Sequence, residues 1–458
     1  GDSLFILGVC FLLLFFLKIM STQSLSALSI GAQRRQNTST NPCRALRTQR
    51  ILRAPSSLRQ ANTSLLLDRR QRQYHTLKKF DVTAAARNYS SSAVPPKVVG
   101  MGGVGVDYLA SVAAYPKADD KLRTDVLEVQ GGGNCGNALT AMARLGAKPY
   151  VITKVGDDSV GDTIISEFKE EGINTDMVLR SPGSSPFTYI IVDRAGGTRT
   201  CIHTPGPECL PAEIDAACLQ EVLDDASLIY FDGRLTEAAL LVVKAAKSAG
   251  VPVLVEGERL RPNLEELMSH ADYIATSKHY TQDLTGEAHV TDAMLATLDR
   301  NPNAKLMVTT LGVQGSVLVE RGGSRDSSTT EKGTLTGVLE QLQAEAAAAG
   351  TPSAVSSGFM QLSSSPSAHS QTRCLAKVTF CPMSPIDQKD VVDTTGAGDA
   401  FIGSVCYAIA AGLPIGQMLE LASYVAATKC KQLGPRPGLP RREDVPPSLL
   451  VEPKVVVA

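Results

Sequence analysis

The stretch VVDTTGAGDAF, residues 391–401, places three small residues directly before an acid that opens an apolar pattern. Val391-Val392 predicts a short strand, Gly-Ala-Gly a turn, and 400–411 a helix. The N–H groups at a helix start have no partner within the helix and attract anions, and glycines let a phosphate approach the backbone. Asp399 is therefore either a helix-capping carboxylate or a catalytic base beside an anion hole.

A second glycine-rich stretch, QGGGNCGNALTAMARLG at 130–146, places two amides ahead of a predicted helix. Glycines permit close approach, and the side chains of Asn134 and Asn137 can donate to and accept from sugar hydroxyls without charge. The alternative is an ordinary glycine-rich helix start. Because this stretch and 100–107 contain Arg144 as their one basic residue, they suit a neutral polyol better than a phosphate ester.

The stretch VVGMGGVGVD, residues 98–107, contains G-x-G-x-x-G after a predicted strand. With Asp119 or Asp120 as the ribose-binding acid, that pattern is compatible with a dinucleotide site and a nicotinamide oxidoreductase. Pro116 follows closely and leaves little room for the helix that such a site requires. The competing use is a glycine turn that presents Asp107 into a cleft.

Charge is distributed unevenly along the 458 residues, whose net charge is −1. Residues 1–97 hold 15 Lys and Arg against three acids, which leaves 30 against 43 in the remainder. An acidic body argues against nucleic acid as the main ligand. The ten cysteines are scattered singly, without a C-x-x-C pair or zinc spacing, so no disulfide framework and no protein metal ligand is assigned.

The N-terminal residues 1–96 have the composition of a targeting segment. From Met20 onward they are rich in Ser, Gln and Arg and nearly free of acids, as in organelle transit peptides. We expect them to be cleaved or disordered, with the chloroplast or another plastid as destination and the mitochondrion as the alternative. The apolar run Leu4–Leu17 is short for a membrane span, so it either belongs to a two-part signal or lies upstream of the true start. No membrane is expected for the mature protein.

From about residue 97, short apolar runs alternate with longer mixed segments, which is the pattern of βα units. It predicts an α/β fold with a mostly parallel sheet and helices on both faces. The expected strands lie within 97–102, 149–156, 227–233, 251–257, 271–277 and 305–312. The expected helices lie within 137–145, 159–171, 237–249 and 260–269.

Two segments break this alternation. Residues 187–203 predict a β-hairpin around an Arg-Ala-Gly-Gly turn, and 125–130 a further strand beside it, which together would form a small β-lid. Residues 322–373 are rich in Ser, Thr, Ala and Gly, which predicts a mobile low-complexity insertion with a helix at 335–349. Residues 448–458 read as a C-terminal tail.

Together, these motifs resemble the PfkB or ribokinase family of carbohydrate kinases over residues 97–447, the insertion excepted. DTTGAGDAF at 393–401 matches the strongest signature of that family, and GGNCGN at 132–137 keeps the spacing of its N-terminal signature. Within the family the chain is most similar to the ketohexokinase branch. The shared features are GGN-x-x-N, FDGR at 231–234, VEGERLRPNLEEL at 255–267, SK at 277–278 and KC at 429–430.

The chain departs from the family pattern at two places. Cys135 and Leu139 stand where the N-terminal signature expects small residues. Ser-Lys-His-Tyr at 277–280 replaces the Asn-x-x-Glu with which many relatives organise magnesium, a motif that ketohexokinases also lack.

The resemblance implies a ribokinase-like three-layer fold with a β-lid, and transfer of the ATP γ-phosphate to a sugar hydroxyl. Asp399 would be the general base, and the anion hole would be made by the amides of Gly396, Ala397 and Gly398. The sugar would contact Asp107, Gly133, Asn134 and Asn137. The nucleotide would contact Arg234, Lys278, Gly312 and Gly315. The resemblance also implies Mg²⁺, a monovalent cation such as K⁺, and a homodimer formed through the lid.

We therefore expect an ATP-dependent kinase of a free sugar, with a ketohexose such as fructose as the first candidate. The alternatives are a nucleoside kinase of the same fold and a non-catalytic scaffold descended from a kinase. The aromatic content of 5% disfavours a nucleoside pocket. The retention of Asp399 with its whole anion hole disfavours a scaffold.

Overall fold

The computed structural model describes residues 94–450, except 125, 197 and 324–330. The expected targeting segment, 1–96, thus lies almost entirely outside the described residues, as does most of the expected tail.

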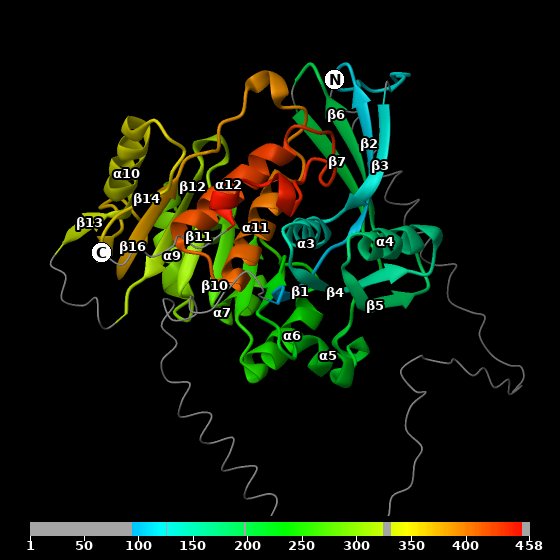
Figure 1. The fold of residues 1–458 in the computed structure, drawn as a ribbon, viewed down its shortest axis with the longest axis horizontal. Coiled ribbons are helices and arrows are strands. Elements are labelled where there is room, and N and C mark those ends of the chain that lie inside the picture. The colour runs from blue at the N-terminus through cyan, green and yellow to red at the C-terminus, as the bar shows by residue number, and fades with distance from the viewer. Residues whose placement is uncertain (1–93, 125, 197, 324–330, 451–458) are drawn as a thin grey trace, which may run out of the picture. The chain divides into compact units, whose positions relative to one another are not determined.

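A large sheet dominates the described part of the chain and has twelve strands. Its order is β13-β15-β16-β12-β11-β10-β9-β8-β1-β4-β5, and β14 also pairs with β16 (Figure 1). Its first seven strands in chain order are β1 (Lys97–Met101), β4 (Lys148–Gly156), β5 (Asn174–Ser181), β8 (Leu228–Phe231), β9 (Val253–Gly257), β10 (Tyr273–Ser277) and β11 (Leu306–Thr310). They pair in parallel throughout and confirm the six strands expected from the apolar runs.

The remaining five strands extend the sheet beyond β11. They are β12 (Ser316–Arg321), β13 (Lys332–Thr334), β14 (Val355–Ser356), β15 (Met360–Ser363) and β16 (Arg373–Cys381). The pairs β11 with β12 and β12 with β16 are antiparallel. The sheet is therefore mostly parallel, as expected, with an antiparallel extension at one edge.

Helices cover both faces of the large sheet. One face packs on α5 (Ala216–Leu223), α6 (Thr236–Ala249), α7 (Leu264–Ser269), α8 (Lys278–Thr285), α9 (Val290–Arg300) and α10 (Leu335–Ala349). The other packs on α3 (Asn134–Arg144), α4 (Ser159–Glu170), α11 (Ala397–Ala411) and α12 (Ile415–Lys429). Strand residues supply both cores alternately, because successive side chains point to opposite faces. None of the helices that the structure describes is long and apolar enough to cross a membrane.

A separate four-stranded sheet stands beside the large one and confirms the predicted β-lid (Figure 1). Its strands are β2 (Gly105–Val112), β3 (Val126–Gly132), β6 (Phe187–Asp193) and β7 (Thr198–Thr204), in the order β3-β2-β6-β7. The hairpin β6–β7 was expected, whereas β2 was not. Strand β2 was not predicted because it begins at Gly105, within the glycine-rich stretch 100–105 that reads as a turn.

The described residues of the segment 322–373 form regular secondary structure, where the composition predicted a mobile insertion. Its described residues add β13, β14 and β15 to the large sheet, and α10 covers 335–349 as expected. Buried leucines of α10 join the core on one face of the sheet. The loop at 364–372 is held by two buried acids, because Asp292 accepts from the amide N–H of Ser365 over 2.8 Å and Glu287 from that of Ser370 over 2.7 Å. Composition alone misled here, since a few spaced apolar residues suffice to anchor a polar segment.

Helices α3 and α11 approach each other closely where Gly403 faces the backbone of α3. A Cβ atom at Gly403 would lie 2.5 Å from the carbonyl oxygen of Ala138, so only glycine permits this separation. The expected strand at Val391-Val392 is absent from this region, and that prediction was wrong. The amide N–H of Val392 instead donates to Cys430 O over 2.9 Å, which docks the segment on the end of α12.

We predict that Gly403→Ala lowers the free energy of unfolding by about 1–3 kcal/mol, because the added methyl overpacks the contact between α3 and α11. Gly416→Ala is the matched control, because its Cβ would meet its nearest neighbour at an ordinary 3.7 Å in the first turn of α12. That substitution should be neutral or stabilising by up to about 1 kcal/mol. Denaturant unfolding of both variants measures the difference. Equal stability of the two variants would contradict the packing argument.

Candidate active site

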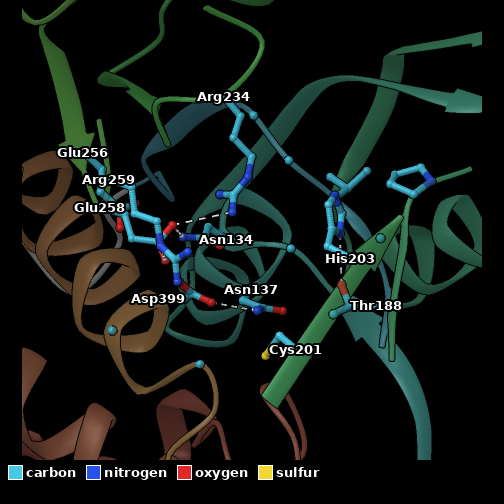
Figure 2. Close-up of a pocket in the computed structure, with 18 of the residues that line it drawn as sticks. Asn134, Asn137, Thr188, Cys201, His203, Arg234, Glu256, Glu258, Arg259 and Asp399 are labelled. Atoms are coloured by element: carbon cyan, nitrogen blue, oxygen red, sulfur yellow. Dashed lines mark hydrogen bonds and ion pairs between the residues drawn. The ribbon is translucent and has the colours of Figure 1, made fainter. Parts of the chain in front are cut away.

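One pocket of about 790 Å³ collects most of the predicted site residues (Figure 2). It is enclosed by the carboxyl ends of β1, β8, β9, β10 and β11, by one face of the small sheet, and by the starts of α3 and α11. Its lining includes the predicted residues Asp107, Gly133, Asn134, Asn137, Arg234, Gly396, Gly398 and Asp399. Segments from four distant parts of the sequence thus meet at one place.

Asp399 reaches this pocket from the first turn of α11. Gly396 precedes the helix with a φ of 77°, and a Cβ there would lie 2.6 Å from the side chain of Pro435, so this position requires glycine. The amide of Ala397 donates to Thr394 O over 3.2 Å and does not line the pocket. The helix start therefore faces the pocket as predicted, while the N–H of Ala397 is engaged within the turn.

The turn before α11 is held from behind by a buried cation. Lys429 is fully buried, and its Nζ donates to Asp393 O over 2.7 Å. The carboxylate of Asp393 accepts from the amides of Thr395 and Gly434, each over 2.9 Å. These bonds fix the backbone that leads into the anion hole, and they give the lysine of the KC feature a structural role.

Asp399 is hydrogen-bonded to the second predicted amide. Asn137 Nδ2 donates to Asp399 Oδ2 over 2.7 Å, and Figure 2 shows the two side chains facing each other. Burial raises the pKa of Asp399 to about 6, and the hydrogen bond from Asn137 opposes that rise. A carboxylate with a pKa near neutrality is well matched to accept a proton.

The small sheet contributes a polar row to the opposite wall. Asp107 on β2, Thr188 on β6 and His203 on β7 are paired in register, and all three line the pocket. His203 Nδ1 lies 3.2 Å from Thr188 Oγ1. Burial raises the pKa of Asp107 to about 6, with the charge of Arg436 acting in the opposite direction. Position 132 requires glycine, because a Cβ there would collide with the Asp107 carboxylate.

A group of arginines surrounds one glutamate at the end of β9. Glu258 lies 3.5 Å from Arg234 and 3.7 Å from Arg259 and Arg261, all nitrogen to oxygen. It also accepts from Asn134 Nδ2 over 3.2 Å (Figure 2). Arg234 Nη1 is buried and lies 3.7 Å from Asp232 Oδ2, but it has no hydrogen-bond partner among the described residues. A guanidinium donor without a hydrogen bond suits a phosphate oxygen in a pocket.

The glycines of residues 98–107 serve packing and not dinucleotide binding. Asp232 is buried and accepts from the amides of Gly103 over 2.8 Å, Cys135 over 3.1 Å and Arg234 over 2.9 Å. A Cβ at Gly102 would collide with this carboxylate. The pattern is followed by strand β2 and not by a helix, so the nicotinamide alternative is wrong.

Three predicted nucleotide contacts lie near the pocket but do not line it. Lys278 opens α8, directly after Ser277, which lines the pocket. Gly312 and Gly315 bound the turn between β11 and β12, shortly after the lining residue Thr310. A Cβ at Gly315, whose φ is 98°, would collide with the carbonyl oxygen of Cys381. Backbone conformation and packing therefore require glycine at position 315 independently of any nucleotide contact.

Several lining residues were not predicted as site residues. Glu256 lies near the end of β9 and accepts a hydrogen bond from Tyr230, and burial raises its pKa well above the ordinary value. The sequence could have indicated Glu256, because it is a charged residue near the carboxyl end of an apolar parallel strand, and ligands bind at the carboxyl ends of such strands. Glu258, Arg259 and Arg261 fall in the stretch 255–267, which the sequence marked as a family feature without assigning it a role. Thr188, Arg199 and His203 lie on the lid and carry no such signal.

Comparison with known proteins agrees with this geometry. The chain matches the pfkB family carbohydrate kinase profile over residues 104–335 and 328–442, and it belongs to that family. It is therefore a phosphotransferase with an alcohol group as acceptor. It is similar to ribokinase from Bacillus subtilis, with 23% identity over 347 residues that cover 75% of this chain and 96% of that protein. It is similar to ketohexokinase from Mus musculus, with 23% identity over 345 residues, 73% of this chain and 96% of that protein.

The fold is that of solved ribokinases. The structure of Arabidopsis thaliana ribokinase complexed with ribose and ATP superimposes with a TM-score of 0.58 and 20% identity, and covers 78% of this chain and 99% of that one. The ribokinase-like α/β fold with a second, smaller sheet is thus confirmed.

We predict an acid limb in the pH dependence of kcat/KM, because Asp399 accepts a proton only when it is ionised. With its pKa raised to about 6, kcat/KM should fall about tenfold for each pH unit below that value. The pKa of Asp107 is raised to a similar value, so Asp107→Asn is the control and should keep the limb. Initial rates across pH measure both profiles. A flat wild-type profile, or loss of the limb in Asp107→Asn, would contradict the assignment to Asp399.

Proposed function

We propose that this protein is an ATP-dependent kinase of a free sugar, with a ketohexose such as fructose as the first candidate. The observation that carries the proposal is the meeting of Asp399 and the start of α11 with Asp107, Asn134 and Asn137 in one pocket. A proton acceptor, an anion-binding helix start and hydroxyl-binding side chains are the parts that phosphoryl transfer to a sugar needs.

The reaction follows from the positions of these groups. Asp399 accepts the proton of the sugar hydroxyl as its oxygen forms a bond to the γ-phosphorus of ATP, while the bond from that phosphorus to the β,γ-bridging oxygen breaks. The N–H groups at the start of α11 stabilise charge on the moving phosphoryl group. ADP leaves with the bridging oxygen, and the sugar leaves as a phosphate ester.

ATP is the proposed phosphoryl donor, and the presence of ATP in the Arabidopsis ribokinase structure supports this choice. Arg234, with its unused buried donor, is the proposed contact to the transferred phosphate. Lys278, Gly312 and Gly315 are proposed to contact the rest of the nucleotide from the adjoining turns.

Mg²⁺ is the proposed metal, and the residues of the pocket fit it. Among the described residues no group of three or more His, Cys, Asp and Glu side chains forms a metal cage. Mg²⁺ needs none, because it is usually held by one or two carboxylates together with substrate phosphates and water. The phosphates and water would supply its ligands, with no protein ligand assigned because Glu258 already lies beside Arg234, Arg259 and Arg261, and the ion would neutralise charge on the phosphates. A monovalent cation such as K⁺ remains part of the proposal, and its omission from the assay would test it.

The choice of a free sugar is supported by neutral and acidic side chains at the acceptor end of the pocket. None of the described lining residues is Phe, Tyr or Trp, which disfavours stacking of a nucleoside base. The sequence predicted few basic residues near the acceptor, because the two glycine-rich stretches contain only Arg144. The pocket corrects this prediction, since Arg199, Arg259 and Arg261 also line it from other segments. These arginines favour a sugar phosphate as the second candidate acceptor.

The small sheet is the proposed surface of a homodimer. Val129, Tyr108, Tyr189 and Ile202 are paired across β3, β2, β6 and β7 and form one row, opposite in parity to the polar row that faces the pocket. Val129, Tyr189 and Ile202 are each more than half exposed. An apolar sheet face of this kind is expected to be covered by a partner.

The proposed cellular location is a plastid, with the mitochondrion as the alternative. It rests on the basic, acid-poor composition of residues 1–96. Microscopy of a reporter protein fused behind these residues would test it, and a cytosolic reporter would refute it.

We predict that the purified protein has twice the mass of one chain by light scattering, and that Tyr189→Lys makes it monomeric. A lysine at the centre of a buried apolar row would be desolvated without a partner. Leu241→Lys on α6 is the control, because Leu241 is 40% exposed and lies outside the small sheet. A monomeric wild type would refute the dimer.

We predict that ADP release from ATP depends on a free sugar and is fastest with a ketohexose, and that Asp399→Asn lowers kcat by a factor of about 100 to 10,000. Asn keeps the size of the side chain but cannot take the proton, so the affinity for ATP should persist. The exposed Asp387→Asn is the control. A panel of sugars, sugar phosphates and nucleosides measures the acceptor preference.

Each other outcome of this panel has a defined meaning. Preferred turnover of sugar phosphates or nucleosides would overturn the free-sugar assignment and leave the kinase standing. An Asp399→Asn protein with more than half of normal turnover would overturn the role of Asp399. Absence of ADP release with every acceptor would favour the scaffold.

A further inference from the structure

Arg436 is a buried charge whose contacts converge on the proposed active site. It follows α12 in the loop Gly434-Pro435-Arg436, and its side chain is 7% exposed. Its Nη1 forms an ion pair with Glu167 on α4 over 3.0 Å, and its Nη2 donates to Gly132 O over 3.1 Å. The guanidinium also lies over the ring of Phe168, 5.2 Å from its centroid. These partners stabilise a charge that would otherwise be costly to bury.

The third nitrogen of this guanidinium contacts the site itself. Arg436 Nε donates to Asn137 Oδ1 over 3.1 Å, while Asn137 Nδ2 donates to Asp399 Oδ2 over 2.7 Å. The three side chains form a continuous chain of hydrogen bonds from the C-terminal loop through α3 to α11.

This chain determines the orientation of the Asn137 amide. A guanidinium has only donors, so it accepts only the oxygen end of an amide as its partner. With Oδ1 turned to Arg436, the NH₂ group must face Asp399. The opposite orientation would place the amide oxygen against the carboxylate and the amide donors against the guanidinium, which is unfavourable at both ends.

Two glycines of the GGGNCGN stretch make room for Arg436. A Cβ at Gly131 would collide with Nη1, and one at Gly136 would lie 2.6 Å from Nη2. Neither glycine has a positive φ, so backbone conformation does not require them. Part of this glycine-rich motif is therefore needed for the arginine to reach Asn137, which is a use independent of the sugar.

We propose that Arg436 is a positioning residue for phosphoryl transfer, which acts through Asn137 to keep an N–H donor on Asp399. The inference rests on the proposed function of Asp399 as the base. Asn137 bound in this way holds Asp399 Oδ2, which leaves Oδ1 to face the acceptor hydroxyl. Arg436 itself does not line the pocket.

The hydrogen bond from Asn137 affects the pKa of Asp399 in a defined direction. Asp399 also interacts with charged groups on three elements, namely Asp232 and Arg234 after β8, Glu256 and Glu258 on and after β9, and Lys429 at the end of α12. The bond from Asn137 opposes the rise in the pKa of Asp399 that burial causes. If that donor turns away, the pKa of Asp399 should rise further and the acid limb of kcat/KM should move to higher pH.

Arg436→Met tests the proposal, with Arg442→Met as the matched control. Arg442 lies in the same C-terminal region and donates to Leu145 O over 2.9 Å, away from the pocket. Arg436→Met should lower kcat by about 10- to 100-fold, shift the acid limb upward, and leave KM for ATP within about threefold. The control should keep the wild-type acid limb and kcat. Equal behaviour of the two variants, or an unshifted acid limb in Arg436→Met, would overturn the proposal.

A double-mutant cycle separates positioning from general support of the fold. If Arg436 acts through Asn137, adding Arg436→Met to Asn137→Ala should lower kcat by less than about twofold further. A full additional loss would show that Arg436 acts by another route and would overturn the inference.

A direct titration keeps the test valid if the protein has no kinase activity or the variant is poorly active. The carboxyl carbon of Asp399 can be followed by ¹³C NMR in the full protein and assigned by its absence in Asp399→Asn. Asn137→Ala, which removes the donor without adding a charge, should raise the pKa of Asp399, and Arg436→Met should do the same. An unchanged titration in both would overturn the inference whether or not any sugar is phosphorylated.

Discussion

The hydrogen bond between Asn137 and Asp399 is the contact on which the arrangement of the site depends. It joins the first turns of α3 and α11, which lie 262 residues apart in the sequence. The bond can form because both helices begin at the same edge of the sheet and pack closely where Gly403 meets Ala138. Each helix start places a functional side chain, Asn137 or Asp399, in the same pocket. The sites for acceptor and phosphoryl group are therefore adjacent as a consequence of helix packing.

Burial of charge is the second constraint, and it affects the pKa of both acidic and basic side chains. It raises the pKa of Asp107 and Asp399 to about 6 and lowers the pKa of Lys429 and Arg436. The protein compensates by giving each group directed partners, such as the ion pair of Arg436 with Glu167. In so desolvated a pocket the remaining electrostatic interactions are stronger than in water. The same burial thus prepares a carboxylate to accept a proton and makes its hydrogen-bond donors influential.

The central layers of the fold could be predicted from local sequence patterns. Apolar runs such as 253–257 are buried on both faces, so they read as parallel strands without further information. The helix at 335–349 was predicted with its observed bounds because its residues favour helix strongly. Val391-Val392 misled because its two apolar residues dock on α12 instead of a sheet. The segment 322–373 misled because composition records average polarity and not the few leucines that anchor it.

The sequence by itself determined the chemical groups, namely the Gly-Ala-Gly turn with Asp399 and the paired amides Asn134 and Asn137. These residues were identifiable because their function depends on local backbone geometry, a helix start with glycines, which short motifs encode. Only the tertiary structure decided what surrounds them: Glu258 beside Asn134, and Arg436 behind Asn137. Those contacts join segments far apart in the chain, and an isolated arginine has no local pattern to distinguish a buried partner from a solvated surface charge. Their roles follow from the packing of the whole sheet and its helices.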